Sequence, residues 1–86
     1  MSMVRQLIGA VSNAQRQIDD QMMKLSSYTS EIDTVSQRVT AALEGGDMPY
    51  AQQMQQQLSH TKRQVEETLA YLQQAKDKLH QVRTVL

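Results

Sequence analysis

Histidines and paired carboxylates are the side chains of this sequence best suited to bind a metal or to catalyse proton transfer. His60 and His80 are twenty residues apart and neither has a second ligand one helical turn away, which is typical of surface histidines. The acidic pairs Asp19-Asp20 and Glu66-Glu67 fall on helix faces that the apolar pattern predicts to be exposed, whereas catalytic carboxylates need burial or neighbouring charges to tune their pKa. The chain also has no cysteine. We therefore expect no enzymatic activity, no metal, no cofactor and no small-molecule substrate.

The charge balance argues against nucleic acid as a partner. Nine Lys and Arg residues are matched by nine Asp and Glu residues, so the formal net charge is zero. Nucleic-acid-binding domains usually carry a basic excess on one face. Trp and Phe are absent and only three Tyr are present, which leaves few side chains on which bases could stack.

No segment has the pattern of a signal peptide or a membrane span. The apolar run from Leu7 to Val11 is too short for a secretory hydrophobic region, and no stretch approaches the roughly 18 apolar residues of a membrane helix. We expect a cytoplasmic protein without membrane association, and export without a cleaved signal remains open.

The elements that must carry these residues follow from a seven-residue repeat in each half of the chain. We use a and d for two positions of the heptad repeat. In the first half, a positions hold an aliphatic residue every seven residues, and d positions lie three residues after each a position. The a set is Val4, Val11, Ile18, Leu25, Ile32 and Val39, and the d set is Leu7, Ala14, Gln21, Tyr28, Val35 and Ala42. In the second half the a set is Ala51, Leu58, Val65, Leu72, Leu79 and Leu86, and the d set is Met54, Thr61, Thr68, Ala75 and Val82. A period of seven over this length predicts coiled-coil helices.

The structure-breaking residues separate the two repeats. Gly45 and Gly46 are expected to end the first helix, because Gly adopts the left-handed conformation of a helix C-terminus without steric cost. Asp47 is a suitable N-cap, and Pro49 fits the first turn of the next helix, where its missing N–H is not needed. The 86 residues are thus predicted to form one domain, with helices over about 3–44 and 49–86 and a turn over about 45–48.

A turn this short predicts an all-α antiparallel hairpin of two long coiled-coil helices. In the expected register each a residue packs against a d residue of the other helix, as in the pairs Val39–Met54, Val35–Leu58 and Tyr28–Val65. Gln21 would then be buried opposite Leu72, where a polar side chain fixes register or oligomeric state at a cost in stability. The poor helix formers from Ser26 to Ser30 predict local opening or bending.

A lone two-helix core of this size is expected to be marginally stable, which favours further association. Apolar residues at e positions, one place after d, suggest a second seam through which two hairpins form a four-helix bundle. The alternative is that the apolar e residues are hydrophobic side chains scattered on the surface, which is normal for a protein. The expected partner surface centres on Met22 and Leu69 and comprises Ile8, Met22, Met23, Leu43 and Leu69.

A helical hairpin of under 100 residues with a Gly-containing central turn and no Cys resembles the WXG100 (ESAT-6-like) superfamily. The resemblance implies a substrate or helper of type VII secretion that pairs as a homodimeric or heterodimeric four-helix bundle. The family's Trp-x-Gly turn is represented only by Gly45-Gly46, and its C-terminal Tyr-x-x-x-Asp/Glu signal is absent, because Ala75 follows four residues after Tyr71. These departures fit a helper that pairs with a larger helical domain better than a directly exported substrate.

The competing hypothesis is a structural or adaptor coiled-coil subunit of a larger assembly unrelated to secretion. Both hypotheses predict the same kind of partner, another helical protein, and the same kind of surface. Genomic neighbourhood would separate them, because a nearby gene for a secretion ATPase or a long helical-domain toxin favours secretion.

Overall fold

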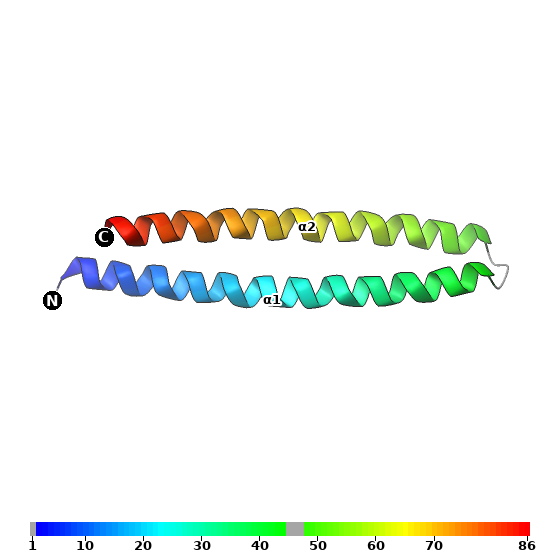
Figure 1. Ribbon diagram of the computed structural model, residues 1–86, viewed down its shortest axis with the longest axis horizontal. Coiled ribbons are helices and arrows are strands. Elements are labelled where there is room, and N and C mark those ends of the chain that lie inside the picture. Colours follow the sequence, from blue (N-terminus) through cyan, green and yellow to red (C-terminus); the bar gives the residue numbers. More distant parts are fainter. Residues whose placement is uncertain (1, 45–47) are drawn as a thin grey trace.

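Two long helices lying side by side make up the structure, a computed structural model that describes residues 2–44 and 48–86, without the side chain of Met48. Helix α1 is Met3–Glu44 and helix α2 is Met48–Val85. The chain ends lie together at one end of the rod, so the helices run antiparallel (Figure 1). The rod measures 68 × 14 × 13 Å between Cα atoms. The prediction of an all-α fold of two packed helices is confirmed, and the described residues form no strand.

The start of each helix has a local cause. The Ser2 hydroxyl accepts a hydrogen bond from the backbone N–H of Arg5 at 3.2 Å, which satisfies a donor that the first turn of α1 leaves free. Pro49 is the second residue of α2, where a helix loses nothing through the missing N–H. Gly45, Gly46 and Asp47, on which the sequence-based turn rests, lie outside the described residues.

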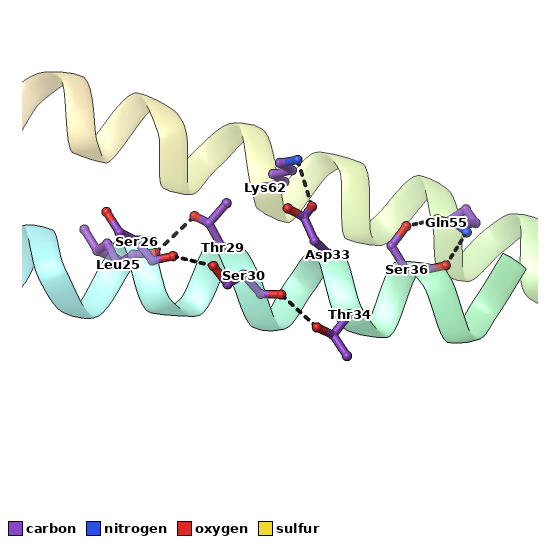
Figure 2. Close-up of polar contacts among 9 residues, drawn as sticks. All are labelled: Leu25, Ser26, Thr29, Ser30, Asp33, Thr34, Ser36, Gln55 and Lys62. Carbon is purple, nitrogen blue, oxygen red and sulfur yellow. Dashed lines mark hydrogen bonds and ion pairs between the residues drawn. The ribbon is translucent and has the colours of Figure 1, made fainter.

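Helix α1 continues without interruption through the Ser- and Thr-rich segment, so the helix is not opened there, and the predicted bending stays a prediction. Hydroxyl groups donate to backbone carbonyls one turn earlier: Thr29 to Leu25 at 3.0 Å, Ser30 to Ser26 at 3.4 Å and Thr34 to Ser30 at 3.1 Å (Figure 2). These bonds satisfy the side chains inside the helix, where they would otherwise compete with its backbone.

The core is a narrow line of a residues. Among the described residues, four apolar side chains are buried, namely Ile32, Val39, Ala51 and Val65, and all four occupy a positions. The remaining a residues from Val11 to Leu79 are half-buried, whereas Val4 and Leu86 at the open end are exposed. The a positions therefore lie in the seam, as the repeat predicts.

The second row of the seam differs from the prediction. Tyr28, Val35 and Met54, all d residues, remain 47%, 37% and 44% exposed. Of the d row only Ala14, Thr61 and Ala75 are half-buried, whereas most e residues are: Ile8, Gln15, Met22, Thr29, Ser36 and Leu43 in α1 and Gln55, Lys62, Leu69 and Lys76 in α2. Each helix is thus turned toward its e row, so that the a and e rows are the more buried ones and most of the d row is exposed, although the predicted partners Val39 and Met54 do line one common hollow.

Candidate interaction surface

One long side of the rod carries polar contacts between the helices. We call it the polar face, and it consists of b and e residues, because antiparallel packing brings the e rows of both helices to the same side. Its contacts join Gln15 to Arg83, Asp19 to Lys76, Asp33 to Lys62, and Ser36 and Thr40 to Gln55. The long side chains of α2 lie over the seam while their polar ends stay near water.

Gln55 makes the densest of these contacts. Its amide oxygen accepts a hydrogen bond from the Ser36 hydroxyl at 2.7 Å. Its amide nitrogen donates to the Ser36 carbonyl and to the Thr40 hydroxyl, each at 2.9 Å. Figure 2 shows Gln55 reaching across from α2 to Ser36 on α1. Since a side-chain amide has a donor end and an acceptor end, one Gln satisfies two neighbouring positions of the opposite helix.

Two ion pairs flank the middle of the polar face. The Lys62 ammonium lies 2.8 Å from the Asp33 carboxylate, and the Lys76 ammonium lies 2.7 Å from that of Asp19. The hydrogen bond to Asp33 and then its charge raise the pKa of Lys62 above the ordinary value of 10.5, with a smaller contribution from Glu66. Both pairs are well exposed to solvent, so they orient the helices more than they stabilise them.

The opposite long side of the rod carries most of the large exposed apolar side chains. We call it the apolar face; it is made by the d rows and by the g rows beside them, which also hold exposed polar residues such as Lys24, Glu31 and Arg38. Its large exposed side chains are Leu7, Tyr28 and Val35 of α1 and Tyr50, Met54, Tyr71 and Val82 of α2. Among the large exposed hydrophobes of the described residues, Met23 alone lies away from the a, d and g rows. Scattered apolar side chains are ordinary on a protein surface, but a row along one side is typical of an interaction surface.

An open hollow marks the apolar face near the turn end of the rod. Its volume is about 260 Å³, and its walls come from both helices. Small side chains create it: Ala42 and Ala51 line it between the larger Val35, Val39 and Met54, with Arg38 and Tyr50 at its margin. The hollow has the size and the lining to accept apolar side chains from another molecule.

The residues predicted for the partner surface lie mostly beside the seam, on the side of the polar face. Ile8, Met22, Leu43 and Leu69 are half-buried, and as e residues they belong to the row that meets the other helix. Met23 is 71% exposed on the back of α1. Met22 and Met23 line a shallow depression with Asp19 and Lys76, which form an ion pair there. Whether a partner binds at this depression stays a prediction, and its surroundings are those of the polar face.

Gln21 occupies a different environment from the one expected. It is exposed on the apolar face, so its predicted burial against Leu72 is wrong. A depression beside it is lined by α1 residues, among them Ala14, Ile18 and Lys24. An amide in an otherwise apolar row is still suited to specify register, toward a partner instead of toward the hairpin's own second helix.

The side chains that could bind a metal or catalyse proton transfer are dispersed along the rod. His60, His80, Asp20 and the pair Glu66-Glu67 are all exposed. Within residues 2–44 and 48–86, no three His, Asp or Glu side chains lie close enough to hold a metal ion. Neither helix, over its described length, contains a stretch apolar enough to cross a bilayer.

Sequence reasoning missed the apolar face because it assigned the d rows to the hairpin's own core. One signal in the sequence favoured the observed arrangement: α2 carries Gln55, Lys62, Lys76 and Arg83 at e, and α1 carries polar partners at matching b and e positions. Long polar side chains beside a seam commonly bridge two helices. Their positions indicate on which side of the a row the two helices are bridged by polar contacts.

No protein-family model matches this chain, and neither a curated protein nor a solved structure is significantly similar to it. The geometry of the two faces therefore carries the functional argument.

Proposed function

We propose that this chain is a non-enzymatic interaction protein that acts by packing its helices against those of another helical chain, as a homodimer or with a larger helical domain. The observation that carries the proposal is the apolar face, which leaves Leu7, Tyr28, Val35, Met54 and Val82 exposed along the rod. A hairpin with four buried side chains among its described residues also has little core of its own. A partner helix packed on the apolar face would bury the d residues that the hairpin leaves exposed.

Two processes fit such a protein. The first is type VII secretion, in which a WXG100-like helper would pair in the cytoplasm with the helical domain of a larger substrate and leave without a cleaved signal peptide. A two-helix hairpin is compatible with that architecture. The second is a structural or adaptor subunit of another assembly. Within the first process, the absence of Trp and of an acidic residue four positions after Tyr71 favours a helper over a directly exported substrate.

The test is a capture experiment with three matched baits, followed by identification of bound proteins by mass spectrometry. The first bait is the wild-type chain, and the second carries Val35→Lys with Met54→Lys on the apolar face. A bait with Met23→Lys serves as the control, because it adds a charge at an exposed apolar residue on the back of the rod. We expect helical proteins, including the chain itself, that bind the wild type and the control and are lost from the apolar-face bait.

Identical recoveries from all three baits would contradict the proposal. A secretion substrate or ATPase among the lost proteins, or encoded beside this chain, would select the first process. Components of another assembly would select the second.

A further inference from the structure

We propose that the apolar face binds a second copy of the chain, with the two rods antiparallel so that the open end of each covers the turn-end hollow of the other. This inference rests on the proposed function, and it names both the surface and the occupant. It follows from the different shapes of the two ends of the apolar face, from the pattern of large and small residues along it, and from its area.

The two ends of the apolar face have complementary shapes. At the turn end, Ala42 and Ala51 leave the hollow of about 260 Å³. At the open end, the large d residues Leu7 and Val82 are 48% and 47% exposed. A second rod turned end over end places Leu7 over the hollow. A twofold axis across the middle of the rod makes the same contact twice, as an isologous dimer requires.

The d row of α1 is complementary to itself under this symmetry. When two α1 helices face each other antiparallel, Leu7 meets Ala42 of the second copy, Ala14 meets Val35, and Gln21 meets Tyr28. Large side chains thus face small ones, as close packing at a fixed helix separation requires. The third contact pairs an amide with a phenol hydroxyl, which can hydrogen-bond, so Gln21 and Tyr28 would fix the register.

The d row of α2 fits the same symmetry axis. Met54 meets Val82 of the second copy, Thr61 meets Ala75, and Thr68 meets its own copy. The axis must then pass between Lys24 and Leu25 in α1 and at Thr68 in α2. The Asp19–Lys76 and Asp33–Lys62 ion pairs on either side show that these positions lie at the same height within about one helical turn. One axis therefore serves both helices.

The apolar face is large enough for a dimer of ordinary size. The Cα atoms span 68 Å by 14 Å, a footprint of about 950 Å² on each copy, which is of the same order as the roughly 800 Å² that each partner buries in a standard interface. The net charge of zero means that two copies approach without overall repulsion, but the exposed Lys24 of each copy lies next to the axis, so these two like charges must extend away from each other toward solvent. In the alternative, turn-to-turn arrangement the two rods are parallel and their turns lie at the same end. It places one alanine-lined hollow over the other, which leaves an unfilled void.

Cysteine cross-linking tests the arrangement in the intact chain, because the natural sequence has no Cys. Two single variants are made, Leu7→Cys and Ala42→Cys, and treated with a short bis-maleimide separately and mixed. If the two copies paired turn to turn, these two positions would be about 50 Å apart at ~1.5 Å per helical residue, so the reagent could not join them. We expect a cross-linked dimer from the mixture and none from either variant alone. Val35→Lys with Met54→Lys should abolish the product, whereas Met23→Lys should leave it unchanged.

The alternatives give different patterns, and light scattering on the wild-type chain separates them. Efficient cross-linking of Ala42→Cys with itself would overturn the antiparallel arrangement in favour of turn-to-turn pairing. A dimer that cross-links in neither way, or that survives Val35→Lys with Met54→Lys, would overturn the assignment of the face. A monomer at every concentration would overturn self-association, and the capture experiment would then decide alone whether the proposed function stands.

Discussion

The polar and apolar faces of this rod flank the same line of a residues, yet only one of them is closed by the hairpin itself. On the polar face, α2 side chains such as Gln55 and Lys62 reach Ser36 and Asp33 across the seam. On the apolar face, Val35 and Met54 stay exposed beside an open hollow. The contrast teaches that the directional contacts of this hairpin gather on one side of the seam, whereas large apolar side chains stay exposed on the other.

The a residues form the core between the two faces, so a cavity among them should have the largest effect on the free energy of unfolding. Ile32→Ala removes a side chain that is 5% exposed and should lower the free energy of unfolding by about 2–4 kcal/mol. In a hairpin this thin, such a loss should also melt both faces together. Thermal unfolding followed by circular dichroism measures the change. A decrease no larger than that of Met23→Ala, a truncation at an exposed site, would show that Ile32 is not part of the core.

Charges on the apolar face should break association without unfolding the hairpin. Val35→Lys with Met54→Lys would place uncompensated ammonium groups beside the hollow and should weaken self-association by about a hundredfold, or about 3 kcal/mol. Sedimentation equilibrium gives the dissociation constant, and circular dichroism at high concentration reports the helicity. Met23→Lys should change neither quantity. Equal weakening by both variants would mean that the apolar face is no different from the back of the rod.

Gln55 sharpens the comparison, because its hydrogen bonds hold the polar face. Gln55→Ala removes the contacts with Ser36 and Thr40 and should lower the free energy of unfolding by about 1 kcal/mol. Gln56→Ala is the matched control, since the neighbouring Gln56 side chain is exposed. Chemical denaturation of both variants measures the difference. Indistinguishable midpoints for the two variants would show that the polar face does not contribute to stability.

The smallest effect is expected at the ion pair between Lys62 and Asp33. Because Asp33 raises the pKa of Lys62, the pair favours folding at neutral pH and loses its effect as the pH rises through that elevated value, above 10.5. Asp33→Asn should therefore lower Tm slightly at pH 7, and its difference from wild type should vanish at strongly alkaline pH. Tm is measured for both proteins across this range. A difference that grows with pH would contradict the assigned cause.

Much of the fold could be predicted from the sequence because the relevant signals are local and repeated. The aliphatic residues every seventh position predict the helices and the a row of the seam, and the breakers near Pro49 separate two helices whose chain ends lie together. The candidate surface could not be predicted in the same way. The d and e rows lie on either side of the a row at similar angles, and both contain apolar and polar residues, so periodicity alone does not decide which row is buried.

The sequence by itself determined two helices, their antiparallel course and the residues along their contact line, since these depend on helical period and on chain breakers. The tertiary structure alone decided the rotation of each helix about its axis. That rotation brings Lys76 within 2.7 Å of Asp19 and leaves Tyr28 exposed on the other side. The physical reason is that rotation depends on contacts between residues far apart in the chain, which a local repeat does not encode. It separates a face that the hairpin closes from one that we propose a second chain completes.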